Sequence, residues 1–221
     1  MDKQFSDYLA RIRFLLIITG TGMAVMGACL GLVGNTEIFW WVNRNITAAP
    51  VFWLPARFFS FFGEWAFMLF AVLMAFRISY KTVIVGLFTW FTGACFSWLF
   101  KLWIFSGALR PYEALARSNP DMHVVDGVNL LRFNTFPSGH TLTAFYAIFF
   151  MAYIFQISRL GYAMLWMVAA LCGISRIVLV QHWPEDVFAG SILGTSAALL
   201  AIQAGYYLPT TGWLNQKPKF L

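Results

Sequence analysis

Two histidines, His140 and His182, are the side chains in this sequence that are best suited to catalysis. Asp186 follows His182 by four residues, so its carboxylate can accept a hydrogen bond from one ring nitrogen and leave the other nitrogen free to attack. His140 is a second titratable group and suits a general acid that protonates a leaving oxygen. Together these side chains have the types that nucleophilic group transfer needs.

Cations and a helix start accompany these residues. Lys101, Arg110 and Arg176 can surround an anion, and the planar fork of arginine matches phosphate oxygens. Ser138 is a good N-cap residue and Gly139 lets a ligand approach the backbone, so the first amides of a helix beginning here would point at the anion. Two histidines among cations, with no cysteine or second acidic cluster nearby, make a poor metal site. Because phosphoryl transfer mainly needs charge stabilisation and positioning, we expect a phosphate site without a metal or a cofactor.

The rest of the sequence is strongly apolar. Hydrophobic residues make up 60% of the 221 residues and charged residues only 11%, against about 45–50% and about 25% in soluble domains. A chain of this size has too little interior to hide so much apolar surface from water. A soluble globular enzyme, a disordered tail and a nucleic-acid reader are therefore excluded. We interpret the net charge of +6 as a signal for loop orientation and as attraction to anionic lipid headgroups.

Six stretches are apolar enough to be transmembrane helices, which need about 20 residues each. They are uncharged except for Glu64 in the second and Arg176 in the fifth. The sequence therefore predicts an all-α, integral-membrane bundle of six helices that forms a single domain over 1–221, with the chemistry-bearing motifs between 101 and 186. The predicted spans are Phe14–Gly34, Phe58–Phe76, Thr82–Phe100, Thr141–Ile157, Gly161–Val180 and Val187–Tyr207.

Basic residues in the short loops predict the orientation of the chain. With the N-terminus inside, eight lysines and arginines fall in short inner segments, as the positive-inside rule favours. Both termini are then cytoplasmic, and the outer ends of the third to sixth helices collect the histidines, the cations and Asp186. Two long segments also face outwards: 35–57, whose aromatic residues suit the lipid–water interface, and 106–136, which is long enough to be functional or disordered. The inner basic residues are Lys3, Arg11, Arg13, Arg77, Lys81, Arg159, Lys217 and Lys219.

Other polar residues have more than one interpretation. Glu64, near the outer end of the second span, could tune a histidine or orient a headgroup, and a capping or water-facing role is equally open. His123 is interpreted as a solvated loop residue. Arg117 and Arg132 could meet a lipid headgroup or be ordinary surface charges.

The motifs resemble the three signature motifs of the type 2 phosphatidic acid phosphatase superfamily. Residues 137–140 (Pro-Ser-Gly-His) and 175–186 (Ser-Arg-x5-His-x3-Asp) match the second and third motifs residue for residue. In the first motif, eight residues separate Lys101 from Arg110-Pro111, which is more than the usual spacing. The resemblance implies a membrane bundle with an outward-facing site and no metal. His182 would be the nucleophile that forms a phosphohistidine, with Asp186 orienting it and His140 protonating the leaving group. The implied phosphate-binding residues are Lys101, Arg110, Ser138, Gly139 and Arg176.

We therefore expect a membrane phosphatase that acts on a phosphorylated or pyrophosphorylated lipid at the outer leaflet of a bacterial inner membrane. Undecaprenyl pyrophosphate, lipid A, phosphatidylglycerophosphate and phosphatidate are all open as substrates. The expected partners are the lipid substrate and the surrounding membrane lipids, with no obligate protein partner. A phosphotransferase that passes the phosphate to another lipid could use the same residues. A transporter or binding protein for anionic lipids would use the basic cluster without the chemistry.

Overall fold

The computed structural model describes residues 3–116, 118–209 and 212–217, so that Arg117 and Lys219 lie outside the described residues. All the regular elements in the described part are helices, which confirms the predicted all-α class. Short turns of π-helix, η1 (Asn43–Thr47) and η3 (Phe100–Ile104), and of 3-10 helix, η2 (Pro50–Phe52) and η4 (Gly212–Asn215), accompany the α-helices. The α-helices are α1 (Lys3–Arg11), α2 (Arg13–Val33), α3 (Asn35–Val42), α4 (Trp53–Phe61), α5 (Trp65–Ala75), α6 (Tyr80–Leu99), α7 (Pro111–Leu115), α8 (Gly139–Ile154), α9 (Arg159–Val178) and α10 (Pro184–Tyr206).

The candidate membrane spans are fewer than the sequence predicts. Among the described residues, four helices are long and apolar enough to cross a membrane, namely α2, α6 extended by η3, α9 and α10. The consecutive helices α4 and α5 meet that test together, as a pair bent by 44°, and would form a fifth span. α8 is apolar but has only 16 residues. The count of six spans therefore stays a prediction that depends on α8.

The predicted second span, Phe58–Phe76, is wrong as one continuous helix. The chain breaks at residues 62–64, where Glu64 adopts an extended conformation with φ −75° and ψ 152°. The start of α8 lies directly against this break, because a Cβ added to Gly63 would lie only 2.7 Å from the carbonyl oxygen of His140. Packing against another helix therefore accompanies the break, and an apolar run of sequence does not reveal such a contact.

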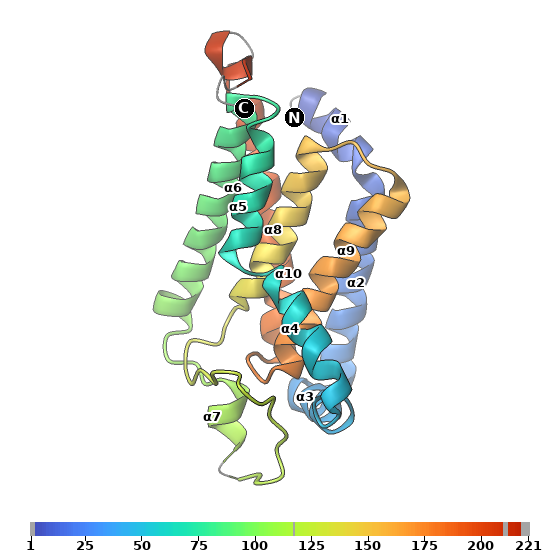
Figure 1. Ribbon diagram of the computed structural model, residues 1–221, viewed down its shortest axis with the longest axis vertical. Helices are drawn as coiled ribbons and strands as arrows, with labels where there is room; N and C mark the ends of the chain where they lie inside the picture. Colours follow the sequence, from blue (N-terminus) through green and yellow to red (C-terminus); the bar gives the residue numbers. More distant parts are fainter. Residues whose placement is uncertain (1–2, 117, 210–211, 218–221) are drawn as a thin grey trace.

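The helices bring the motif-bearing residues to one end of the bundle. Figure 1 shows α1 and the short C-terminal element η4 near one end, and α7 at the opposite end. α6 and α9 run toward the α7 end, whereas α8 and α10 run away from it. The last turns of α6 and α9 and the first turns of α8 and α10 therefore lie at the same end, opposite the first and last described helices.

α8 is the central helix of the bundle. It packs against α5, α6, α9 and α10, and its residues Phe149 and Phe150 are fully buried. Two glycines on α10 allow the closest approach: a Cβ on Gly190 would lie 2.7 Å from the carbonyl oxygen of Ser138, and Gly194 meets the α8 backbone in the same way. Small residues four apart favour such close helix packing in membranes. This contact fixes the start of α8 against the start of α10.

The described part of the long segment before α8 packs on the bundle. The amide of Arg110 donates to the carbonyl oxygen of Arg132 at 2.9 Å, and that of Thr135 donates to Ala108 at 3.2 Å, so the two ends of the segment run side by side. The side chain of Asn43 bonds to the middle of the segment. Within this segment, Arg110 and Thr135 lie beside the beginning of α10, where they contact Gln181 and Asp186.

Candidate active site

The residues singled out from the sequence come from separate elements that end or begin at the α7 end of the bundle. Lys101 lies in η3, Arg110 immediately before α7, Ser138 immediately before α8, Gly139 and His140 in the first turn of α8, Arg176 in the last turn of α9, His182 between α9 and α10, and Asp186 in the first turn of α10.

His182 and Asp186 form a buried pair. Nδ1 of His182 lies 3.2 Å from Oδ2 of Asp186, and their side chains are only 2% and 1% exposed. The same carboxylate oxygen accepts the backbone amide of Trp183 at 2.8 Å and a short hydrogen bond from the hydroxyl of Thr135. A neutral imidazole that donates from Nδ1 to Asp186 keeps its lone pair on Nε2. The pair therefore fixes which nitrogen of His182 carries the lone pair.

The electrostatics favour a neutral His182. Burial lowers the pKa of this imidazole well below its ordinary value, and the positive charges of Arg110 and Arg176 act in the same direction. Nε2 faces Arg110, whose Nη1 lies 3.4 Å away. An uncharged nitrogen beside a fixed guanidinium is arranged to attack an anion that the guanidinium holds.

Arg110 is held in place by backbone carbonyls. Its Nε donates to the carbonyl oxygen of Phe133 at 3.0 Å and its Nη1 donates to that of Gln181 at 2.8 Å. The side chain is buried, since the residue is 4% exposed. These bonds fix the guanidinium beside His182 before any ligand binds.

The start of α8 has the cap that the sequence predicts. The hydroxyl of Ser138 accepts hydrogen bonds from the amide of Thr141 at 3.4 Å and from its hydroxyl at 2.9 Å. A Cβ on Gly139 would lie 3.8 Å from Nζ of Lys101, so the ammonium group reaches the first turn of α8 despite the long spacing of the first motif. The π-helical turn η3 carries Lys101 to this position. An ammonium beside the positive end of a helix is a suitable place for an anion.

Arg176 has a donor without a protein partner. Its Nη1 donates to the hydroxyl of Ser60 at 2.6 Å. In the described part of the structure, the buried Nε has no hydrogen-bond partner, although the residue is only 8% exposed. A buried guanidinium group that is satisfied on one side only is suited to bind an oxyanion with its remaining donors.

His140 and Glu64 form a second pair of a histidine with a carboxylate. Nε2 of His140 lies 2.9 Å from Oε1 of Glu64, with 25% and 46% of the two side chains exposed. Glu64 precedes α5, but its side chain makes no capping hydrogen bond there. Of the interpretations left open by the sequence, the capping role is therefore wrong, whereas Glu64 both contacts a histidine and is partly exposed.

Sequence reasoning missed three residues that contact the site. Thr135 bonds to Asp186, Ser60 bonds to Arg176, and Gln181 accepts from Arg110. Ser60 lies four residues before Glu64, a spacing that could have drawn attention to it, whereas Thr135 and Gln181 lie in loops with no periodic signal. His123 is exposed, as predicted. Arg132 is on the surface and lies 3.6 Å from Glu113.

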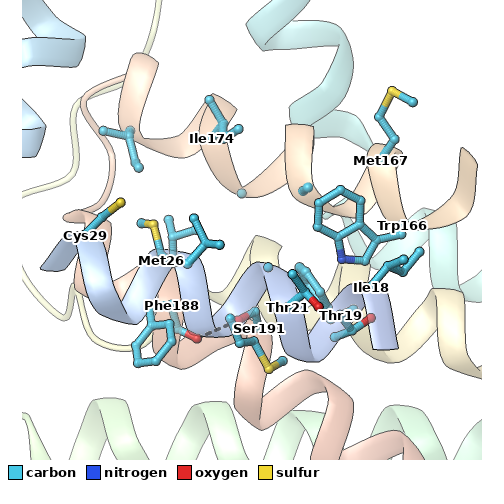
Figure 2. Close-up of a pocket in the computed structure, with 18 of the residues that line it drawn as sticks. Ile18, Thr19, Thr21, Met26, Cys29, Trp166, Met167, Ile174, Phe188 and Ser191 are labelled. Carbon is cyan, nitrogen blue, oxygen red and sulfur yellow. Dashed lines mark hydrogen bonds between the residues drawn. The ribbon is translucent and has the colours of Figure 1, made fainter. Parts of the chain in front are cut away.

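A cavity of the described residues lies away from the motif residues. It has a volume of about 670 Å³ and lies between α2, α9 and α10. Figure 2 shows Met26 and Cys29 of α2, Trp166 of α9 and Phe188 of α10 around it, and no charged residue lines it. Phe145 of α8 also lines it. The cavity has no group for phosphate chemistry.

Comparisons of the sequence identify relatives. A family model described as the PAP2 superfamily matches residues 87–209. The chain is 45% identical over 67 residues to the bacitracin transport permease protein BcrC of Bacillus licheniformis, which covers 30% of this chain and 31% of that protein. It is 39% identical over 80 residues to the lipid A 1-phosphatase of Porphyromonas gingivalis, which covers 34% of this chain and 16% of that protein. These matches span less than a third of the length of either relative.

A comparison of folds agrees with the sequence match. The crystal structure of LpxE from Aquifex aeolicus has a TM-score of 0.61 to this chain, with 22% identity, and covers 76% of this chain and 94% of that one. At this identity the likeness concerns the fold. The family match extends over more than half of the chain and contains all three motifs between Lys101 and Asp186. On these grounds the chain belongs to the PAP2 superfamily, the type 2 phosphatidic acid phosphatases that its motifs resemble.

Proposed function

We propose that this chain is a membrane phosphatase that removes phosphate from a phosphorylated or pyrophosphorylated lipid through a phosphohistidine at His182, without a metal. One observation carries the proposal: the buried pair of His182 with Asp186 leaves Nε2 facing Arg110, whose Nη1 lies 3.4 Å away. This is the arrangement of an oriented nucleophile beside an anion-binding group.

In the first step, Nε2 of His182 attacks the phosphorus atom and a P–N bond forms. The bond from phosphorus to the lipid oxygen breaks, and His140 gives its proton to that oxygen. The proton on Nδ1 of His182 stays in place, where Asp186 stabilises the positive charge that develops on the ring. Arg110 and Arg176 stabilise the negative charge on the transferring phosphoryl group, together with Lys101 and the first amides of α8.

In the second step, water replaces the histidine. His140, now neutral, takes a proton from a water molecule as the water oxygen bonds to phosphorus. The P–N bond breaks, inorganic phosphate leaves, and both histidines return to their first states. The same two side chains thus act in both half-reactions in reversed roles.

A lipid substrate is supported by a groove along α6. A cavity of about 520 Å³ ends at Lys101. A phosphate at Lys101 would leave a hydrocarbon tail free to follow this groove. The apolar helices and the lipid A 1-phosphatase among the relatives support the same class of substrate. The groove is lined by Phe91, Ala94, Cys95, Ser97, Trp98 and Lys101.

The test is phosphate release from lipid A, undecaprenyl pyrophosphate, phosphatidylglycerophosphate and phosphatidate, in detergent with a chelator. We expect His182→Ala to reduce turnover by at least about 10⁴-fold, because it removes the nucleophile, while lipid binding survives. His123→Ala, an exposed histidine, is the matched control and should keep wild-type activity. Metal-dependent release, or full activity of His182→Ala, would contradict the mechanism.

Two alternatives predict other outcomes of the same assay. A phosphotransferase would form a new phospholipid when an acceptor lipid is added and release little phosphate without it. A transporter or binding protein for anionic lipids would release no phosphate, and Arg176→Ala would weaken its binding while His182→Ala would not. Product analysis with and without an acceptor therefore separates the three.

We further propose a bacterial inner-membrane location, with both termini cytoplasmic, the site facing the periplasm and one domain over 1–221. The positive-inside count supports this orientation, as does the position of α1 and η4 at the end opposite α7 (Figure 1). Ser118 lies near α7, and Gln156 lies between α8 and α9 at the other end, and both are exposed. In intact cells a membrane-impermeant thiol reagent should label Ser118→Cys and spare Gln156→Cys. The reverse pattern would invert the topology.

A further inference from the structure

The break between α4 and α5 contacts the site although it lies outside the family match of residues 87–209. We call residues 60–64 the α4–α5 junction. Ser60 accepts the hydrogen bond from Arg176 at 2.6 Å, and Glu64 contacts His140 at 2.9 Å. The junction therefore touches both a phosphate-binding residue and the general acid of the proposed mechanism.

A close backbone contact holds this junction in place. A Cβ on Gly63 would lie 2.5 Å from Cβ of His140 and 2.7 Å from its Cα and its carbonyl oxygen. Real Cβ atoms do not come so close to other heavy atoms, so a glycine is required for the junction to lie where it does. The packing of the backbone at Gly63 against His140 thus holds Glu64 close to His140, so that the contact does not depend on a flexible side chain alone.

The charges around His140 indicate what the carboxylate of Glu64 does there. Burial disfavours a proton on His140, the positive charges of Arg176 and Lys101 act in the same direction, and Glu64 is the acidic residue that opposes them. An imidazolium among cations loses its proton readily unless a carboxylate stabilises it. Since Nε2 is engaged by Glu64, Nδ1 is the ring nitrogen left for the leaving oxygen.

We propose that Glu64 is a positioning residue that fixes the ring of His140 through Nε2 and keeps a proton available on Nδ1 for the leaving group. This inference rests on the proposed function, in which His140 protonates the lipid oxygen. Glu64 does not touch the phosphate in this scheme. Its effect must therefore depend on how much the leaving oxygen needs a proton.

The experiment compares two leaving groups in the purified full-length protein. An alkyl phosphate leaves as a poor alkoxide and needs protonation, whereas a 4-alkylphenyl phosphate of similar length leaves as a stabilised phenolate. We expect Glu64→Gln to lower kcat/KM about 30-fold for the alkyl phosphate, which is part of the roughly 10²–10⁴-fold that a general acid contributes, and by less than about threefold for the aryl phosphate. Glu64→Asp should recover part of the loss. Glu37→Gln neutralises another exposed carboxylate and should change neither value.

Two further variants test whether Glu64 acts through His140 or only stabilises the fold. Glu64→Gln should add no further loss to His140→Asn if both act in the same proton transfer. Gly63→Ala keeps the carboxylate but displaces the junction, so it should show the same dependence on the leaving group. Thermal unfolding in detergent checks that each variant is folded.

Each outcome has one meaning. Equal losses on the two substrates, or additive losses in the double variant, overturn the role of Glu64 while leaving the phosphohistidine mechanism intact. A wild type that releases phosphate from neither substrate refutes the proposed function, and the role of Glu64 falls with it.

Discussion

The site contains two pairs of a histidine with a carboxylate, and they are built differently. His182 and Asp186 are four residues apart, and their side chains are 2% and 1% exposed. His140 and Glu64 are 76 residues apart, and their side chains are 25% and 46% exposed. The first pair is local in sequence and buried, whereas the second joins the α4–α5 junction to α8 and is partly exposed.

The difference matches what each histidine is proposed to do. A nucleophile needs a free lone pair and a fixed direction, and burial with several hydrogen bonds on Asp186 supplies both. A general acid must give up and regain a proton in each cycle, which access to water and a carboxylate partner both assist. In the proposed mechanism the same residue types thus take opposite roles, in line with their different exposure.

The largest effect that would test this comparison is expected from Asp186→Asn. The substitution keeps the volume of the side chain but removes the charge that orients His182 and stabilises it after attack. We expect kcat to fall about 10³–10⁴-fold. Because every substrate needs the nucleophile, the loss should be equal for alkyl and aryl phosphates, unlike the loss in Glu64→Gln. Steady-state kinetics on the two substrates measure this directly.

A dependence of the Asp186→Asn loss on the leaving group would break the comparison. It would mean that Asp186 acts on proton donation as well as on the nucleophile. Asp121→Asn, an exposed aspartate in the long loop, is the matched control for charge removal and should keep wild-type kinetics.

A smaller effect is expected from Thr135→Val, which tests how much the hydrogen bond from Thr135 contributes to the pair of His182 with Asp186. The hydroxyl of Thr135 donates to Oδ2 of Asp186, and the valine keeps the shape while removing this bond. A lost hydrogen bond to a charged group is worth about 1.5–3 kcal/mol, so we expect kcat to fall by roughly 10–100-fold. Thr47→Val removes a comparable buried bond, to the carbonyl oxygen of Val178, and should leave kcat near that of the wild type. Similar losses in both variants would indicate a general packing defect.

The sequence predicts the first pair much better than the second. The four-residue spacing of His182 and Asp186 is a local property, and so is the N-cap at Ser138, so both can be read from the residues themselves. The convergence of the motif residues at one end follows from the alternating direction of successive spans. These predictions need only short-range geometry and a membrane-spanning topology.

The second pair depends on tertiary packing. Glu64 meets His140 only because the chain breaks at 62–64, and the break is fitted to the start of α8 through Gly63. A glycine in an apolar run is common in membrane helices and therefore does not predict a break. Thr135 lies in a loop whose path is fixed by hydrogen bonds to the backbone at 108, which no periodic pattern encodes.

The smallest effect concerns stability against pH and tests whether His182 is neutral. Burial lowers the pKa of His182 in the folded protein, while an unfolded histidine titrates near its ordinary value of about 6.5. Between these two values the unfolded state binds more protons, so stability must fall as the pH drops below about 6.5. Glutamine does not titrate, so His182→Gln should lose less stability between pH 7.5 and pH 5. We expect the acid-induced drop in Tm to be smaller by about 2–4 °C, which corresponds to roughly 1 kcal/mol in a chain of this size.

The control for this experiment is His123→Gln, which makes the same replacement at an exposed histidine outside the site. A larger acid loss in His182→Gln than in the wild type would have a definite meaning. It would show that Asp186 holds a proton on His182 in the folded state, so that the buried pair is an ion pair whose nucleophile is charged at rest. His182 would then have to lose that proton before attack, and the contrast between a neutral buried histidine and a partly exposed one paired with Glu64 would no longer explain the two roles.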